Sequence, residues 1–226
     1  MKKKSCVWLV CVLLCLASVG KAQVVTLENG FAITSLRSGI GLDKVYPYQV
    51  ALGMQYADKG WFNLSSNIGY LRRGAQVELA SSYVDYDEQI IMKSKLHYIT
   101  LNTTFDIKKT SRDGYTFFVG AGPRLDFNLK STIEMYADYS GPSDFEPTKE
   151  KLDGIHTVLF GLKCVGGIRK DFGNMQLGLN IAYLPSFTKL AYKVHDRTFT
   201  FGLSLGYKLG AGKEKAETIR SVRRHK

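Results

Sequence analysis

The chain has 226 residues, of which 45% are apolar and 23% are charged, and its formal net charge is +11. This composition excludes an intrinsically disordered chain, because such chains are poorer in apolar residues. No apolar run reaches ~18 residues, so the sequence also excludes a protein that crosses a membrane with helices.

The first 22 residues have the pattern of a secretory signal peptide. Three lysines at 2–4 precede an apolar stretch at 6–19, and Gly20 and Ala22 are the small residues that a signal peptidase reads. Cleavage before residue 23 leaves 204 residues with a net charge of +7. It also leaves Cys164 as the single cysteine, which excludes a disulfide framework although the chain is exported.

After the leader, apolar and polar residues alternate with the period of two that is typical of β-strands. The first such stretch is the weakest and runs over about 29–37. Seven clearer strands follow at 46–56, 62–70, 99–107, 117–128, 158–169, 176–183 and 199–209. The pattern predicts an all-β fold of eight antiparallel strands in one barrel domain over 23–209.

The connections between these strands alternate in length. Short turns with Gly or Asp are expected at 57–60, 108–114 and 170–174, and longer loops at 37–45, 74–95, 131–156 and 185–197. Successive connections of an up-and-down sheet lie at opposite ends. All the long loops therefore gather at one end, which is typical of transmembrane barrels.

The composition of the two strand faces indicates which face meets lipid. The polar face carries nine glycines and only seven charged residues, namely Arg73, Asp106, Arg124, Asp126, Lys163, Arg169 and Lys208. A water-exposed surface is typically ~25–35% charged, whereas a narrow lumen favours small residues and a few paired charges. The opposite face carries one charge, Arg72, and aromatic residues near the strand ends. The sequence therefore predicts an eight-stranded antiparallel up-and-down transmembrane β-barrel, with a soluble lipocalin-like barrel as the alternative.

The inward charges are expected to form a structural network rather than an active site, with a proton or ion path as the alternative. The residues expected in this lumen network are Asp106, Arg124, Asp126, Lys163 and Arg169. Opposite charges that are buried together have to pair, because an isolated buried charge is costly. Eight strands enclose an interior that side chains fill, so general diffusion through the barrel is not expected.

The sequence contains no motif for catalysis, a cofactor or a metal. None of the histidines at 97, 156, 195 and 225 has the spacing of metal ligands. We expect a protein that is not an enzyme and has no cofactor; an enzyme at the outer rim, using residues such as Asp85, Asp87, His156 or His195, is an alternative.

The tail at 210–226 has six Lys/Arg and two Glu and is expected in the periplasm. It has no nucleic-acid motif, so nucleic acid is not an expected partner.

The two longest predicted loops, 74–95 and 131–156, together hold ten Asp/Glu and four lysines. If the first strand starts in the periplasm, these loops lie outside the cell. Aromatic residues that could anchor a protein partner there are Tyr83, Tyr86, Tyr136, Tyr139 and Phe145. The hypothesis is a contact with a cationic or metal-bridged extracellular or envelope partner, and the alternative is a solvated surface.

Three sequence elements resemble a known family. They are Val-Gly-Ala-Gly-Pro-Arg at 119–124, His-Tyr-Ile at 97–99 and the closing Phe-Gly-Leu-Ser-Leu-Gly-Tyr at 201–207. With them the chain resembles the PorT-like and OmpA-like outer-membrane β-barrel domains of Gram-negative bacteria. The resemblance implies a monomeric barrel surrounded by outer-membrane lipid, and it implies no single activity. A structural or interaction role in the envelope is the first expectation; a narrow channel, a rim enzyme and an accessory subunit of a secretion or assembly complex are the alternatives.

Overall fold

The computed structural model describes residues 24–37, 44–82, 87–139, 147–190 and 195–209. Within these ranges, the side chains at 35–37, 57–59, 79–82, 87–89, 137–139 and 195 are outside the description. The predicted leader and the basic tail also lie outside the described residues.

Nine antiparallel strands form one sheet, and eight of them close into a barrel. Neighbours around the ring are β4-β3-β2-β1-β9-β8-β7-β5, and β4 pairs with β5 to close it. The remaining strand, β6, pairs with β5 alone. The strands are β1 (Val24–Arg37), β2 (Tyr48–Lys59), β3 (Phe62–Ser82), β4 (Asp87–Thr110), β5 (Tyr115–Tyr139), β6 (Thr148–Lys151), β7 (Val158–Phe172), β8 (Met175–Pro185) and β9 (His195–Lys208). The predicted all-β, eight-stranded up-and-down barrel is confirmed.

The first and last strands of the ring close the barrel. Strand β1 pairs with β9 along its whole length, from Val24 opposite Lys208 to Arg37 opposite His195. Closure leaves the barrel without a free edge, so backbone N–H and C=O groups are satisfied between strands even where no water is present. Strand β1 begins earlier than the alternation predicted, and it therefore includes Glu28.

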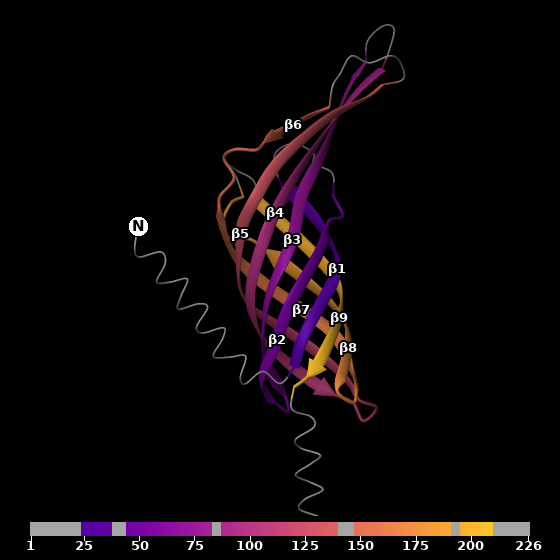
Figure 1. Ribbon diagram of the computed structural model, residues 1–226, viewed down its shortest axis with the longest axis vertical. Coiled ribbons are helices and arrows are strands. Elements are labelled where there is room, and N and C mark those ends of the chain that lie inside the picture. The colour runs from indigo at the N-terminus through magenta and orange to yellow at the C-terminus, as the bar shows by residue number, and fades with distance from the viewer. Residues whose placement is uncertain (1–23, 38–43, 83–86, 140–146, 191–194, 210–226) are drawn as a thin grey trace, which may run out of the picture.

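The tight turns lie at one end, the lower end of Figure 1. Gly114 joins β4 to β5 with φ of 78°, and Gly173 joins β7 to β8 with φ of 63°. Both backbones are in the left-handed region that favours glycine, which explains the Gly in these predicted short turns. The short turns predicted for this end are confirmed.

The opposite end corrects the loops predicted at 74–95 and 131–156. Strand β3 continues to Ser82, β4 begins at Asp87, and β5 runs to Tyr139, so these three strands project beyond the barrel as a twisted sheet (Figure 1). We call the part of β3 from Arg72, of β4 up to His97, and of β5 from Lys130, together with β6, the upper sheet. Its strands were not predicted because the apolar outer face ends at Arg72, although backbone pairing continues.

Within the barrel the polarity of a soluble protein is inverted. Outward side chains are apolar and exposed, as for Leu52 (54%), Val119 (70%) and Leu203 (57%). Inward side chains are polar and buried, as for Asn63 (1%) and Thr104 (2%). The two faces are arranged as their composition predicts.

Candidate functional site

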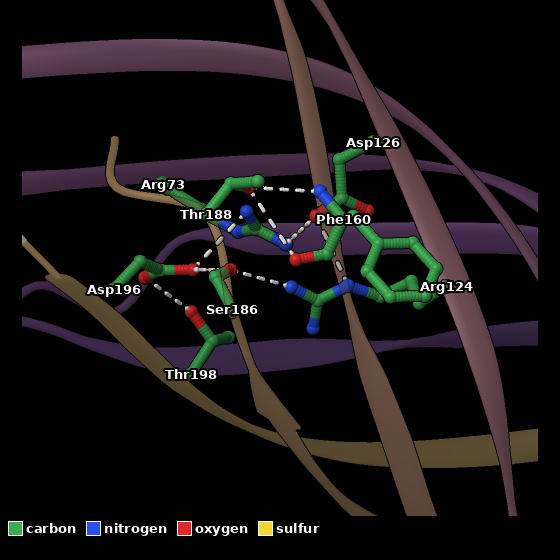
Figure 2. A network of polar contacts seen from close by, with 8 residues as sticks. All are labelled: Arg73, Arg124, Asp126, Phe160, Ser186, Thr188, Asp196 and Thr198. Carbon is green, nitrogen blue, oxygen red and sulfur yellow. Dashed lines mark hydrogen bonds and ion pairs between the residues drawn. The ribbon is translucent and has the colours of Figure 1, made fainter. Parts of the chain in front are cut away.

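The lumen holds a buried ionic cluster at the base of the upper sheet, drawn in Figure 2. The guanidinium of Arg73 on β3 lies with Nη2 2.7 Å from Asp126 Oδ2 and Nη1 3.1 Å from Asp196 Oδ2. The Nε of Arg124 lies 3.0 Å from the same Asp126 oxygen. Two cations from β3 and β5 thus meet two carboxylates from β5 and β9, and the cluster is neutral. We call these four residues the upper ionic cluster.

Polar neighbours orient the members of this cluster. Arg124 Nη2 donates to Ser186 Oγ at 2.8 Å, and Thr198 Oγ1 donates to Asp196 Oδ1 at 3.0 Å. Ser186 belongs to the segment after β8, which is held to β7 where the Phe160 N–H donates to Thr188 Oγ1 at 2.9 Å (Figure 2). The upper ionic cluster therefore links strands on opposite sides of the barrel.

Apolar side chains close the lumen above the upper ionic cluster. The guanidinium of Arg73 lies 4.9 Å from the centre of the Tyr98 ring, which belongs to this layer. Two partly buried residues of the segment that follows β6, Leu152 and Ile155, pack against it. We call the layer the roof; its buried members are Ala75, Leu96, Tyr98, Leu159 and Leu190. The roof separates the charged lumen from the upper end of the molecule.

Two further ion pairs lie deeper in the lumen. Lys163 Nζ is 3.9 Å from Glu28 Oε2, and Arg169 Nη2 is 3.7 Å from Asp106 Oδ2. Arg169 also lies 3.6 Å from the ring centre of Phe118. Between this level and the upper ionic cluster is a cavity of about 30 Å³, whose lining includes Glu28, Arg124 and Lys163. A cavity of this size has room for about two waters.

The Asp106 carboxylate is the most densely hydrogen-bonded acid of the lumen. Asn63 Nδ2 donates to it at 3.1 Å, Thr104 Oγ1 donates at 2.8 Å, and Ser65 Oγ also donates. A Cβ atom at Gly120 would overlap this carboxylate, so glycine makes the room for it. These donors satisfy the hydrogen-bonding capacity of a buried carboxylate.

The residues expected in the lumen network therefore lie in stacked layers. Arg124 and Asp126 meet in one layer and Asp106 and Arg169 in another, while Lys163 pairs with Glu28 between them. Sequence reasoning missed Asp196, because it lies inside the loop predicted at 185–197. It missed Glu28, because the first strand was predicted to begin one residue later. Extending the alternation by a few residues at each strand end would have placed both on the inner face.

The aromatic residues proposed as surface contacts have different positions. Tyr136 lies on β5 of the upper sheet, with Lys93 Nζ 4.9 Å from the centre of its ring. Tyr139 ends the same strand, and its side chain is outside the description. Tyr83, Tyr86 and Phe145 lie outside the described residues.

Of the four residues proposed for a rim enzyme, the structure describes the side chain of His156. His156 is exposed after β6, whereas Asp85 and the side chains of Asp87 and His195 are outside the description. Among the described residues, no group of three His, Cys, Asp or Glu could hold a metal ion.

Cys164 is a half-buried free thiol on β7. In the part of the chain that the structure describes, no helix is long and apolar enough to cross a membrane.

Comparisons with known proteins find solved structures that are distantly similar to this chain. Neither a family model nor a curated protein sequence matches it. A solved structure that matches is Ail of Yersinia pestis in complex with the heparin analogue sucrose octasulfate, with 11% identity over 82% of this chain and 99% of Ail and a TM-score of 0.42. Neisserial surface protein A matches with 14% identity over 82% of this chain and 96% of its own, with a TM-score of 0.42. The outer membrane protein OprG of Pseudomonas aeruginosa matches with 10% identity over 84% and 97% of the two chains, with a TM-score of 0.44.

These matches concern the fold. Their identities to this chain do not exceed 14%, and their TM-scores do not exceed 0.44. The more specific resemblance to the PorT-like family finds no support in them, since no family model matches. The short Gly-rich elements behind that resemblance occupy positions where many narrow barrels need small residues.

Proposed function

We propose that the chain is a non-enzymatic outer-membrane barrel that holds its upper sheet at the cell surface and does not conduct. The outer face of the barrel supports insertion into lipid. In β4, the outward residues from Ile99 to Ile107 cover about 27 Å of strand, which at a tilt of ~40° spans about 21 Å. That height is close to the ~25 Å apolar band of outer-membrane barrels.

Aromatic residues border this apolar band. Trp61 and Phe62 pack with ring centres 4.6 Å apart near the lower end, and Tyr183 and Phe199 stack at 4.7 Å nearer the upper end. Aromatic girdles at both interfaces are a feature of membrane barrels. We call the outward apolar residues between these two aromatic borders the apolar belt.

The observation that carries the non-conducting proposal is the filled lumen. Its ion pairs join five cations to five carboxylates, so the paired groups are neutral at each level and leave no excess charge to select an ion. The cations are Arg73, Arg124, Lys163, Arg169 and Lys208, and the carboxylates are Glu28, Asp106, Asp126, Asp171 and Asp196. The roof closes the lumen above them. A structural plug therefore explains these charges better than an ion path does.

The orientation follows from the chain direction. Strand β1 begins at the lower end, where the tight turns are, and a signal peptide would deliver that end from the periplasm. The upper sheet then faces outside the cell. This orientation supports a role in which the barrel is the anchor and the upper sheet is the interacting part.

Planar-bilayer recording of the purified full chain tests the non-conducting part of the proposal. We expect no resolved current steps from the wild type. A variant with a shorter roof side chain and a broken ionic cluster, Leu190→Gly with Arg73→Ala, serves as the positive control if it still shows heat-modifiable migration on a gel. Regular steps from the wild type would favour the narrow channel instead.

Cell fractionation tests the location. The protein should be recovered with outer membranes, and protease added to intact cells should cut the upper sheet before the turns of the lower end. Recovery as a soluble periplasmic protein would contradict membrane insertion. Cross-linking in intact cells would separate a lone barrel from an accessory subunit of an envelope complex, since a subunit should give one discrete adduct.

A further inference from the structure

The outer face of the upper sheet is rich in cations. Three strands supply them in register. One row across β3, β4 and β5 consists of Arg72, His97 and Lys130, and a second row consists of Gln76, Lys93 and Glu134. Strand β6 adds Lys149 opposite Glu134. We call five cations of this face the basic patch; they are Arg72, Lys93, Lys95, Lys130 and Lys149. A sixth cation, Lys151, lies opposite Thr132 on the same face and pairs with Asp153. Among the described side chains of β3, β4 and β5, the carboxylates on this face are Glu134 and Glu78, so the basic patch exceeds them by three charges.

Contacts within the upper sheet hold the middle of the basic patch in place. The Glu134 carboxylate accepts a hydrogen bond from Lys149 Nζ at 2.7 Å and also forms an ion pair with Lys95. One carboxylate thus serves two ammonium groups, which remain 59% and 31% exposed, respectively. Lys93 is placed over the Tyr136 ring. The patch is therefore a supported array with excess positive charge.

The basic patch begins where the apolar belt ends. The last apolar row joins Tyr70, Ile99 and Phe127 across three strands, and the next outward row joins Arg72, His97 and Lys130. The Tyr70 hydroxyl lies 2.5 Å from His97 Nδ1, so a girdle aromatic is tied directly to the first row of the patch.

The height of this first row matches a lipid headgroup layer. Two residues along a strand rise about 7 Å, or about 5 Å along the membrane normal at a tilt of ~40°. A headgroup layer is roughly 5–7 Å thick on each side of a ~30 Å hydrocarbon core. Arg72 and Lys130, both exposed, would therefore lie at the depth of the headgroup phosphates.

We propose that the basic patch binds phosphate-bearing lipid headgroups of the leaflet at the upper end. Lys and Arg near a membrane surface each contribute about 1 kcal/mol to attraction by anionic lipid. Continuity with the apolar belt favours a lipid over a soluble polyanion, because acyl chains would pack on Tyr70 and Phe127 below the phosphates. The proposal rests on membrane insertion as proposed above. The proposal also assigns an anionic partner to the upper sheet. The ten Asp/Glu of the predicted loops had instead favoured a cationic partner.

The experiment uses the full chain folded in a zwitterionic detergent and titrated with diphosphoryl lipid A, with bound lipid counted by native mass spectrometry. The same glycolipid without its phosphates is the chemical control. The test variant is Arg72→Gln with Lys130→Gln. The matched control is Lys109→Gln with Arg112→Gln, which removes the same charge from exposed positions at the opposite end of the barrel, away from the leaflet at the upper end.

We expect the test variant to lose affinity by about 30-fold, the equivalent of roughly 2 kcal/mol at 1.4 kcal/mol per tenfold. Removing the phosphates should lower wild-type affinity by at least as much, and the control variant should keep it within about threefold. Equal losses in the two variants would overturn the proposal in favour of general charge attraction. Equal binding of the dephosphorylated glycolipid would overturn it in favour of acyl-chain packing alone.

Binding of a soluble polyanion tests the remaining alternative, in which the patch recognises a polysaccharide and not a lipid. If heparin binds through Arg72 and Lys130 while lipid A does not, the patch is a polysaccharide site and the lipid proposal is wrong. Heat-modifiable migration of every variant is recorded in parallel. Loss of that migration in the wild type would refute membrane insertion itself, whereas normal migration with no lipid selectivity would refute only the basic patch as a lipid site.

Discussion

The barrel and the upper sheet are made of the same strands but have opposite polarity. Below Arg72, strands β3, β4 and β5 place apolar side chains outside and polar side chains inside. Above it, they place cations outside and apolar residues such as Ala75 and Leu96, which belong to the roof, inside. The alternation of side chains continues through β3 and β4, and in β5 it is interrupted at Leu129 alone, where the register shifts. The position where polarity inverts therefore marks the boundary of the lipid, and a change of residue class along a strand does not mark its end.

The largest expected effect comes from breaking the polar interior of the barrel. Asp126→Ala leaves Arg73 and Arg124 buried without their shared carboxylate, which should cost about 3–5 kcal/mol of unfolding free energy. Urea unfolding in detergent, followed by heat-modifiable migration, measures the loss. Asp153→Ala is the control, since Asp153 is 85% exposed in its pair with Lys151 and should contribute about 0–1 kcal/mol. Equal midpoints would mean that the upper ionic cluster is hydrated.

The apolar interior of the upper end should be nearly as sensitive. Leu96→Ala removes a fully buried roof side chain, and a loss of about 2–5 kcal/mol is expected because a cavity remains. The control is Leu129→Ala, whose side chain is 60% exposed and should cost less than about 1 kcal/mol. The same urea titration compares the two, and similar costs would show that the roof is loosely packed.

The outer faces of the two regions should respond differently to an added cation. Leu179→Arg puts a charge on the apolar belt of β8, at a side chain that is 57% exposed, and should cost about 2–4 kcal/mol near the bilayer midplane. Gln76→Arg puts the same charge on the outer face of the upper sheet and should change stability by less than about 0.5 kcal/mol. Folding into lipid vesicles measures both. A mild effect at residue 179 would contradict the position of the belt.

The smallest effect concerns pH and the upper sheet alone. Hydrogen bonds from Lys149 and Lys95 lower the pKa of Glu134 to about 2. Since the folded pKa lies below the ordinary value of 4.5, the contribution of Glu134 is present above pH ~4.5 and is lost as pH falls through about 2. Glu134→Gln should therefore raise protease cutting of the upper sheet at pH 6, and the difference from wild type should vanish near pH 2. Glu150→Gln, on the exposed strand β6, should leave cutting unchanged, and a difference that persists at low pH would exclude the carboxylate charge as its cause.

Part of the candidate site could be predicted from the sequence. Arg124, Asp126 and Lys163 were expected inside the barrel because each alternates with apolar neighbours along its own strand. Their partners Asp196 and Glu28 were not predicted, because the predicted strands stopped one to three residues short of them. The basic patch was also hidden. Arg72 was counted as a charge at a strand end, and Lys130 lay between a predicted strand and a predicted loop, while Lys93, Lys95 and Lys149 were counted among acidic loops.

The sequence by itself determined the strand number, the inward and outward faces and the end at which the tight turns lie. These properties are local, because side chains of a strand alternate in direction and a turn needs particular backbone angles. The tertiary structure decided which charges pair, where the strands end and what the upper sheet presents outward. Those properties depend on the register between strands that are distant in the chain, and register is set only when the barrel closes and buries one face.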